Sequence, residues 1–434
     1  MNSWLTWMET LHPSEIELGL GRIREVAVRL GMLKPDARVI TVAGTNGKGS
    51  CIAVLNAFLR QAGCNVGVYT SPHLSVYNER IKINDDLVGD QQLCDAFHVI
   101  DLARGEISLT YFEFGTLAAL YLFSLTALDY WLLEVGLGGR LDAVNIIDHN
   151  VSVITSIELD HEQWLGHTRD DIASEKAGIL REQGVFVCGE SNPPPTMLAR
   201  ADELHIQPVR FGKAFGYEEH FIDGVRHYSF SLTCRGRTQV LNVPFELVHL
   251  PIQSVCTALQ VLALEDCMPE VTKVKSVLSS LFFAGRFEKI HRNDIEIFLD
   301  VAHNPAAVEL LVKQLDDYLR YTGCSNVCLS VVVAMMADKN ITGSLAPFAS
   351  RVKHWFVTSF GEFSRSASVP QLTQALSDNG VVFENITGCI DVDEALASAI
   401  AYAVRQEASQ TKSVLVVTGS FVTVAKARDF LGLS

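Results

Sequence analysis

The chain has 434 residues, 48% of them hydrophobic and 20% charged, and its formal net charge is -15. This length exceeds one ordinary hydrophobic core and predicts two domains, and the composition is that of an ordered globular protein. The acidic charge argues against nucleic acid or an anionic membrane as the main partner, although a small anionic ligand needs only a few local cations. The ten cysteines lack the paired spacing of a zinc site, so we expect free thiols in a reducing cytoplasm.

A glycine-rich stretch near the N-terminus follows an amphipathic helix predicted over residues 14–33. Residues 39–50 have the sequence VITVAGTNGKGS, which predicts a buried strand, a tight turn and a helix from Lys48 onward. In a phosphate-binding loop of this kind, backbone N–H groups and a helix N-terminus converge on an anion. Lys48 would contact the outer phosphates and Ser50 would offer Mg2+ a hydroxyl. Gly49 separates the two, unlike the usual Walker pattern, so an ordinary glycine-rich turn is the alternative.

The next part of the chain alternates short apolar strands with helices. Strands are predicted at 66–70, 131–135, 151–157 and 185–188, and helices at 48–62, 90–103, 114–128 and 172–181. This alternation is typical of a mainly parallel sheet with helices on both faces. The helix at 114–128 is strongly apolar but too short to span a membrane. Residues 205–248 instead alternate around Gly224 and Gly236 and predict a small antiparallel patch, before helices at 253–264 and 271–281.

A domain boundary is predicted near residues 283–289, because the strand and helix alternation starts again beyond it. The predicted strands are 295–301, 327–334, 355–359, 381–383 and 414–418. The predicted helices are 308–319, 342–348, 370–377, 393–407 and 422–431. We therefore expect a second, Rossmann-like α/β domain of ordinary size.

Polar side chains follow several strands of the first domain. Ser71 follows the strand at 66–70, Glu134 lies at the end of the next, and His161 follows the strand at 151–157. The carboxyl ends of parallel strands meet at one edge, so we expect these side chains to gather with Ser50. Oxygen ligands with one imidazole suit Mg2+ or Mn2+ better than zinc. Each residue alone is better explained as structural, but their joint placement favours a metal site.

Other candidate residues in the first domain have two interpretations each. Lys176 lies on a predicted helix, where a solvated lysine is the ordinary expectation. Arg80 could face an anionic substrate or simply be solvated. Tyr111, Phe112 and Glu113 could wall an aromatic ligand by stacking, or they could begin a helix with core aromatics.

Two charged residues are candidates in and before the second domain. Asp300 ends an apolar strand and precedes AHNP at 302–305, where Pro305 suits the first turn of a helix. A charge at such a strand end favours contact with a ligand. Arg286 lies on the linker, where a cation could reach phosphates bound by the first domain.

Seven motifs in chain order resemble one known family. They are GTNGKGS at 44–50, SPHL at 71–74, LEVGLGGRLDA at 133–143, DH at 160–161 with LG at 165–166, EKAGI at 175–179, GRF at 285–287 and DVAHNP at 300–305. Together they are similar to the folylpolyglutamate synthase and dihydrofolate synthase family, a branch of the Mur ligase superfamily. The additional Gly49 is the form this branch uses, whereas muramyl ligases close the loop one residue earlier. The resemblance implies an N-terminal ATP-binding domain with a pterin site over 1–284 and a Rossmann-like glutamate ligase domain over 285–434.

The resemblance also implies roles for individual residues. The residues implied to bind ATP are Asn46, Gly47, Lys48, Gly49, Ser50, Ser254, Arg286 and Asp300. Those implied to serve two Mg2+ sites are Ser50, Ser71, Glu134 and His161. Those implied to take part in catalysis are Lys48, His161, Lys176 and His303, with Lys176 carbamylated to support the second metal site. Ser254 stands where the family has an asparagine, so it would keep only part of that ATP contact.

The substrate residues follow in the same way. Those expected at the pterin substrate are Thr10, Leu11, His12, Pro13, Arg80, Tyr111, Phe112, Glu113, Leu141, Asp142 and Ala143. The implied reaction passes the γ-phosphoryl group of ATP to a carboxylate, and the amine of L-glutamate then attacks the acyl phosphate. We expect dihydropteroate and reduced folates as substrates of a cytoplasmic monomer that binds neither nucleic acid nor membrane. The alternatives are a Mur-type ligase acting on a peptidoglycan precursor, a monofunctional folylpolyglutamate synthase and a non-catalytic nucleotide-binding switch.

Overall fold

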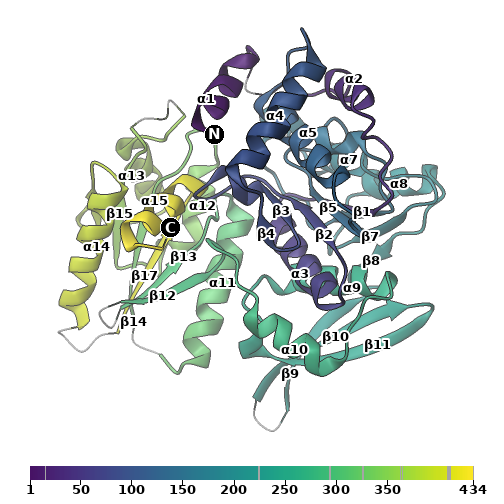
Figure 1. The fold of residues 1–434 in the computed structure, drawn as a ribbon. Helices are drawn as coiled ribbons and strands as arrows, with labels where there is room; N and C mark the ends of the chain where they lie inside the picture. Colours follow the sequence, from purple (N-terminus) through teal and green to yellow (C-terminus); the bar gives the residue numbers. More distant parts are fainter. Residues whose placement is uncertain are drawn as a thin grey trace. The chain divides into compact units, whose positions relative to one another are not determined.

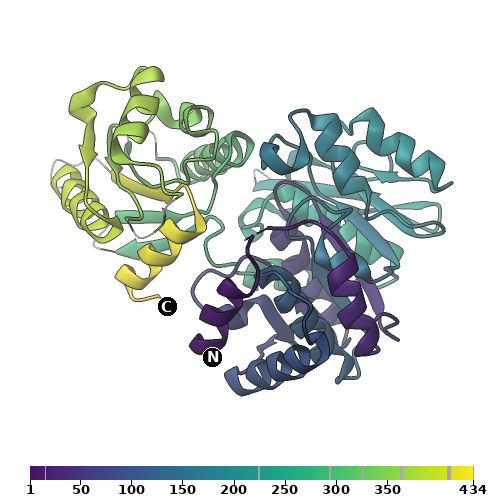
Figure 2. The ribbon, with the colours of Figure 1, turned by 90° about the horizontal axis from the view of Figure 1, so that it is seen from above.

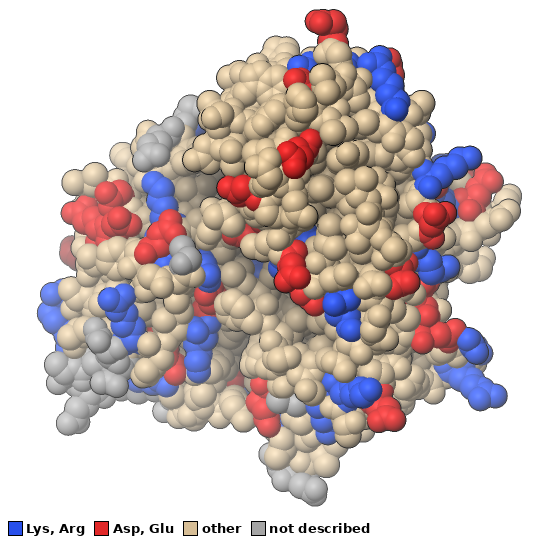
Figure 3. Space-filling view, in the orientation of Figure 1, with Lys and Arg blue, Asp and Glu red and all other residues tan. Residues whose placement is uncertain are grey.

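The computed structural model describes every residue except 15, 223, 224, 293, 294, 325, 326, 362, 364, 408–411 and 434. The chain forms two compact units, Met1–Leu281 and Phe282–Ser434, which are drawn in Figures 1 and 2. The boundary predicted from the sequence lies a few residues further along the chain. Among the described residues, no helix is long and apolar enough to cross a membrane. On the face in Figure 3, acidic and basic side chains are interspersed.

An eight-stranded sheet organises the described part of the first unit. Its order is β4-β3-β2-β5-β1-β6-β7-β8; the pairs from β2 to β8 are parallel, and β3 and β4 add an antiparallel edge. The strands are β1 (Arg38–Ala43), β2 (Val66–Tyr69), β3 (Ile81–Ile83), β4 (Asp86–Leu87), β5 (Tyr130–Glu134), β6 (Val151–Ile154), β7 (Val185–Cys188) and β8 (Val209–Arg210). The predicted mainly parallel sheet is confirmed.

Helices cover both faces of this sheet (Figure 1). α3 packs on α9, whereas α5 packs on α1, α2 and α4, as right-handed crossovers require for the successive parallel strands. The helices are α1 (Asn2–Leu11), α2 (Gly21–Arg29), α3 (Lys48–Gln61), α4 (Asp90–Arg104), α5 (Tyr111–Ser124), α6 (Glu162–Leu165), α7 (Arg169–Ala177), α8 (Pro195–Glu203), α9 (Ile252–Leu264) and α10 (Val271–Ser280), with short 3-10 turns at η1 (Tyr77–Arg80), η2 (Ala143–Ile146) and η3 (Phe245–Leu247).

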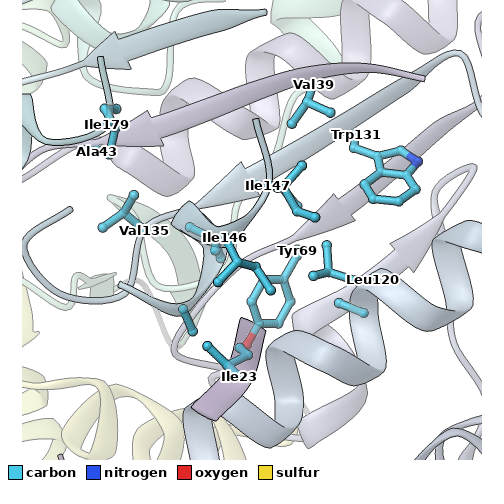
Figure 4. Packing of buried hydrophobic residues seen from close by; sticks show 14 of the residues in the cluster. Ile23, Val39, Ala43, Tyr69, Leu120, Trp131, Val135, Ile146, Ile147 and Ile179 are labelled. Carbon is cyan, nitrogen blue, oxygen red and sulfur yellow. The ribbon is translucent and has the colours of Figure 1, made fainter. Parts of the chain in front are cut away.

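The core of the first unit forms because its central strands are apolar on both faces. Every residue of β2, β5 and β6 is buried, and β1 is buried after its first residue, as expected for parallel strands covered by helices on two sides. Figure 4 shows Val39, Tyr69 and Trp131 from three neighbouring strands, with Leu120 of α5 and Ile23 of α2 in the same cluster. This rigid sheet fixes the loops at its carboxyl edge.

A three-stranded antiparallel sheet, in the order β11-β10-β9, forms a separate part of the first unit. Its strands are β9 (Gly216–Ile222), β10 (Val225–Cys234) and β11 (Arg237–Pro244). The sequence predicted this antiparallel patch; Gly224, one of the two glycines used for that prediction, lies outside the described residues.

The second unit has a six-stranded sheet in the order β12-β13-β17-β14-β15-β16, in which only the pair β12 and β13 is antiparallel among the described strands. The strands are β12 (Glu288–Arg292), β13 (Ile295–Leu299), β14 (Val327–Val333), β15 (His354–Val357), β16 (Ile386–Gly388) and β17 (Lys412–Thr418). The helices are α11 (Pro305–Tyr321), α12 (Ile341–Ala349), α13 (Val369–Asp378), α14 (Val392–Glu407) and α15 (Phe421–Leu431), with a 3-10 turn at η4 (Phe383–Asn385). Figure 2 shows helices on both sides of this sheet, and the Rossmann-like prediction is confirmed.

Two local predictions differ from the structure, and the first helix was missed. The helix predicted over 14–33 spans only Gly21–Arg29, because the apolar residues before it recur at every second position rather than at helical spacing. Helix α1 was not predicted. The strand predicted at 381–383 is wrong: Phe383 begins a 3-10 turn and is 73% exposed, and the strand begins at Ile386.

Candidate active site

The glycine-rich loop leaves β1 and enters α3 at the carboxyl edge of the first unit's sheet. Gly47 caps α3 in the left-handed region, with φ 85, a conformation that is cheap only for glycine. Nζ of Lys48 donates to the carbonyl oxygens of Gly44 at 2.9 Å and Thr45 at 3.2 Å, and Ser50 is buried in the first turn. A basic side chain and a helix N-terminus therefore lie together, which is an anion-binding arrangement.

The loop after β6 holds the glycine-rich loop in place. Oγ1 of Thr155 donates to the carbonyl oxygen of Asn46 at 2.7 Å, and the backbone N–H of Asn46 donates to Oγ of Ser156 at 3.0 Å. The sequence reasoning missed Thr155 and Ser156, although two hydroxyl residues directly after a strand are a signal of such a loop. Ser254 lies on the other side: a Cβ on Gly47 would be 2.4 Å from Oγ of Ser254.

The structure brings two residues of the predicted metal set into contact. Because β2, β5 and β1 are parallel neighbours, their carboxyl ends lie side by side. The backbone N–H of Ser71 donates to Oε2 of Glu134 at 3.1 Å, and Glu134 is buried. Glu134 pairs in register with Val42 of β1, two residues before Gly44, and after burial it is the second cause that raises the pKa of Cys51 in α3.

Lys176 is buried, contrary to the expectation of a solvated helical lysine. It is 4% exposed in α7, and burial together with Lys48 lowers its pKa to about 7, against the opposing effect of Asp160 and Asp142. A lysine with this pKa is largely neutral near pH 7.5. His161 follows Asp160 at φ 52 and precedes α6, and its backbone N–H donates to Oδ1 of Asp160 at 2.8 Å. Four sequence-distant segments thus supply ionisable groups to one region.

Close backbone packing joins the glycine cluster after β5 to α7. A Cβ on Gly139 would lie 2.9 Å from the carbonyl oxygen of Glu175 and 3.0 Å from that of Lys176. The backbone N–H of Arg140 donates to the Glu175 carbonyl at 2.8 Å, and the Arg140 guanidinium pairs with the Glu175 carboxylate at 2.7 Å. The position of Lys176 therefore depends on this glycine.

The same loop continues through the predicted pterin residues Leu141, Asp142 and Ala143. The carboxylate of Asp142 accepts hydrogen bonds from the backbone N–H groups of Leu137 at 2.8 Å and Val144 at 3.0 Å. Burial raises the pKa of Asp142 to about 6, although those N–H groups oppose the shift. Asp142 is therefore a buried carboxyl that titrates within reach of physiological pH.

The N-terminal segment that is predicted to contact the substrate is linked to Glu113 through Glu17 and Arg22. Nε2 of His12 lies 3.1 Å from Oε2 of Glu17, Glu17 pairs with Arg22, and Arg22 lies 3.2 Å from Oε1 of Glu113. Glu113 also caps α5 by accepting from the backbone N–H of Thr110 at 2.8 Å. The sequence reasoning missed Glu17 and Arg22. These contacts do not involve the other predicted members of the segment, which are Thr10, Leu11 and Pro13.

Aromatic rings and one cation form a cluster beside Glu113. The Arg80 guanidinium lies over the rings of Tyr77 at 5.3 Å and Tyr111 at 5.6 Å, and its Nε donates to Nδ1 of His73 at 2.8 Å. The ring of Phe112 covers Gly136, where a Cβ would be 2.6 Å from it. Within the described residues, the buried hydroxyl of Tyr77 has no hydrogen-bond partner, which suits a polar ligand. Tyr77 was missed by the sequence reasoning, and His73 was noted only as part of the SPHL motif, without a role.

The second unit gathers its own predicted residues around an aromatic ring. The Arg286 guanidinium lies 5.2 Å from the ring centre of Phe421, and the His303 ring lies 6.4 Å from it. Asp300 accepts from the backbone N–H groups of Phe287 at 2.7 Å and Ala302 at 2.9 Å, and burial raises its pKa. Phe421 begins α15 and was not identified from the sequence.

The donor atoms of the predicted metal set are two hydroxyls, one carboxylate and one imidazole. In the part of the chain that the structure describes, no group of three or more His, Cys, Asp and Glu residues is arranged to hold a metal ion. A metal at this edge would therefore need the hydroxyls of Ser50 and Ser71, or oxygen atoms that a bound ligand brings to the site. Oxygen donors of this kind fit Mg2+ or Mn2+, which bind with water and phosphate oxygens.

Comparison with known proteins decides the family. Residues 285–421 match the family described as "Mur ligase, glutamate ligase domain". A relative from Escherichia coli (strain K12), named dihydrofolate synthase/folylpolyglutamate synthase, is 39% identical over 429 residues, which cover 99% of this chain and 95% of the relative. The chain belongs to the dihydrofolate synthase/folylpolyglutamate synthase family.

Solved structures of dihydrofolate synthase/folylpolyglutamate synthase proteins share the whole fold. The structure described as E. coli FolC in complex with DHPP and ADP has a TM-score of 0.88 and 38% identity, and the match covers 99% of this chain and 97% of that one. The bifunctional enzyme from Yersinia pestis, complexed with AMPPNP and a Mn ion, has a TM-score of 0.87 and 38% identity over 100% of this chain and 98% of that one.

Proposed function

We propose that this protein is an ATP-dependent ligase that adds L-glutamate to dihydropteroate, giving dihydrofolate, and to reduced folates, giving folylpolyglutamates. The observation that carries the proposal is the similarity over nearly the full chain to proteins that are named for both activities, dihydrofolate synthase and folylpolyglutamate synthase. These relatives are 39% and 38% identical to this chain. The anion-binding loop, with a buried carboxylate beside it, supplies the chemistry that such a ligase needs. A peptidoglycan-precursor ligase and a nucleotide switch have no comparable support.

The proposed reaction has two transfers. A carboxylate oxygen of the pterin substrate attacks the γ-phosphorus of ATP, the bond to ADP breaks, and an acyl phosphate forms. The amine of L-glutamate then attacks the acyl carbon, loses a proton and displaces phosphate, leaving an amide. The first transfer is needed because a carboxylate is a poor electrophile, and positioning of the reactants supplies much of the rate.

The glycine-rich loop is proposed to bind ATP. Lys48 would exchange its carbonyl contacts for phosphate oxygens, while the loop N–H groups of Asn46, Gly47 and Gly49 would surround them. Mg2+ bound at this edge would neutralise charge on the transferring phosphoryl group. The residues proposed to hold it, directly or through water, are Ser50, Ser71, Glu134 and His161, and their oxygen-rich donor set fits a hard cation.

Lys176 is proposed to carry a carbamate. Its lowered pKa leaves a neutral amine near pH 7.5, the form that attacks CO2; the nitrogen then loses a proton and a carboxylate results. Burial of that anion beside the Lys48 ammonium is electrostatically favourable, whereas burial of two lysine cations is not. The modified side chain would add the oxygen ligands that the second metal site otherwise lacks.

The substrate and nucleotide contacts follow the two clusters. We propose that the pterin ring binds beside Asp142, Phe112 and Tyr111, where a carboxyl and aromatic faces can meet an aminopyrimidine. Residues 1–284 would supply this site and the ATP loop, including Ser254. Residues 285–434 would supply nucleotide contacts from Arg286 and Asp300, with His303 proposed for the glutamate step.

One substrate panel tests the proposal. The protein, ATP, Mg2+ and L-glutamate are combined with dihydropteroate, a reduced folate or a peptidoglycan precursor, and ADP release and product mass are measured. Glutamate-dependent ADP release with dihydropteroate and with the folate is expected. Failure with dihydropteroate alone would indicate a monofunctional folylpolyglutamate synthase, and ATP binding without glutamate-dependent turnover would indicate a switch.

Two variants test the carbamate. Lys176→Ala should lose most turnover while still binding ATP, and a short carboxylic acid should restore part of the rate by replacing the lost carboxylate. Lys213→Ala, which removes an exposed lysine of the same unit, is the control and should behave as the unmodified protein. Normal turnover in Lys176→Ala would show that the carbamate role is wrong.

A further inference from the structure

The two helices that begin beside the glycine-rich loop also end beside each other. α3 starts at Lys48, and α9 starts where Ser254 faces Gly47. The helices pack along one another and have 14 and 13 residues. They therefore run in the same direction and reach a common end about 20 Å from the loop, at 1.5 Å per residue.

Both helices end in the same local structure. Gly63, at φ 87, follows the last turn of α3, and Asp266, at φ 56, follows the last turn of α9. In each case the next backbone N–H, of Cys64 or Cys267, bonds to a carbonyl five residues earlier, at 3.0 and 2.9 Å. This Schellman arrangement folds the residue after the left-handed position back over its own helix. A cysteine occupies that position in both helices.

Both turns reach Tyr130 of β5. Sγ of Cys267 lies 3.6 Å from the Tyr130 hydroxyl and donates to the Glu265 carbonyl at 3.3 Å, and the carbonyl of Asn65, the residue after Cys64, accepts from the Tyr130 backbone N–H at 3.1 Å. Burial, and then the nearby Cys267, raise the pKa of the Cys64 thiol. Both cysteines are free and only half-buried, so a dissolved reagent can reach them.

Polar contacts tie both turns to the rest of the unit. Nη1 of Arg60 donates to the Cys64 carbonyl at 2.6 Å. The Glu265 carboxylate accepts from Arg38 at 2.5 and 2.7 Å and from the Tyr130 hydroxyl at 3.3 Å. Arg60 of α3 thus anchors the Cys64 turn, and Arg38 of β1 and Tyr130 of β5 anchor the turn before Cys267, at the shared end of the two helices.

We propose that Cys64 and Cys267 are a redox-sensitive pair that a small disulfide, such as oxidised glutathione, converts into an intramolecular disulfide. The thiolate of one cysteine attacks an oxidant sulfur and displaces one thiolate. The other cysteine attacks the protein sulfur of the mixed disulfide and releases the second. The protein loses two protons and two electrons, and the oxidant becomes two thiols. The inference does not depend on which acid the enzyme activates.

The cross-link would pin α3 to α9 at the end remote from the nucleotide loop. It joins positions about 200 residues apart, so it strongly restricts the unfolded chain and should stabilise the first unit. The cysteine contacts themselves lie outside the predicted ATP and substrate residues, so the glycine-rich loop keeps its shape in the oxidised protein.

The test uses the full-length protein and oxidised glutathione. Incubation at about pH 8.5 supplies the attacking thiolate, and free thiols are then alkylated before non-reducing proteolysis and mass spectrometry. The expected product is one peptide pair joining Cys64 to Cys267, about 2 Da lighter than the sum of its parts and separable by reductant. The thermal midpoint of the oxidised protein should rise by about 4 °C or more.

Two variants make the result decisive. Cys267→Ser should leave Cys64 as a mixed disulfide with glutathione and abolish the rise in midpoint. Cys324→Ser, a change at a half-buried cysteine of the second unit, should leave the cross-link intact. Separate glutathione adducts on Cys64 and Cys267 in the unmodified protein, or a link from either to a third cysteine, would overturn the proposal.

Discussion

Replacing Gly139 with alanine should disturb Lys176 without touching it. The added methyl would lie 2.9 Å from the Glu175 carbonyl oxygen, 3.0 Å from the Lys176 carbonyl oxygen and 3.0 Å from Cγ2 of Ile179. Two of these three atoms are backbone, so the loop and α7 must separate by about 0.5 Å to reach ordinary contact distances. That movement also stretches the 2.8 Å hydrogen bond from Arg140 to Glu175.

The expected cost follows from overpacking. A methyl forced into a filled contact costs about 1–3 kcal/mol, which lowers the thermal midpoint of a unit of this size by about 2–10 °C. Because small misplacements of reacting groups cost rate steeply, turnover should fall about tenfold. Thermal unfolding and glutamate-dependent ADP release measure the two effects.

Gly21→Ala is the matched control. Gly21 begins α2, has an ordinary φ, and a Cβ there would meet nothing within 4 Å. Its replacement should be neutral or slightly stabilising, because alanine is the better helix former. If Gly139→Ala were as stable and as active as Gly21→Ala, the dependence of Lys176 on this glycine would be refuted.

Three further outcomes are expected. Burial lowers the pKa of His149 to about 4 from 6.5. Between these two values the unfolded chain binds more protons than the folded one, so stability falls as the pH decreases. His149→Gln should remove about 3 kcal/mol of that pH dependence, measured by denaturant unfolding at pH 7 and 4. Arg22→Met removes the cation beside the buried Glu113 carboxylate, which should lower the free energy of unfolding by about 1–3 kcal/mol. The variant should also raise KM for the pteroate substrate while KM for ATP stays constant. Phe421→Ala removes a ring contact worth about 0.5–1 kcal/mol to Arg286, and should weaken nucleotide binding two- to fivefold by calorimetry, whereas an unchanged affinity would exclude Phe421 from that site.

The parts of the site that could be predicted from the sequence rest on local rules. The strand, glycine turn and helix around Lys48 have a sequence signature, and parallel pairing then brings Ser71 to Glu134. Both steps need only short-range patterns and the rule that strand ends share an edge. The roles assigned to these residues remain proposals.

The parts that could not be predicted depend on tertiary packing. Lys176 has the sequence context of a solvated helical cation, and its pKa is lowered only by burial in the folded unit and by the nearby Lys48. The pairing of Arg22 with Glu113 joins residues 91 positions apart in the sequence, so no local pattern marks it. Phe421 follows a strand that lies beside β13 only through the order of the sheet, which a single sequence does not encode locally.

The hydroxyl contacts from Thr155 and Ser156 to Asn46 have a thermodynamic consequence. They order the glycine-rich loop before any phosphate binds. The conformational entropy of the loop is therefore lost during folding, and nucleotide binding does not have to order it. Nucleotide association should accordingly be limited by diffusion and charge attraction, with a rate that falls as salt concentration increases.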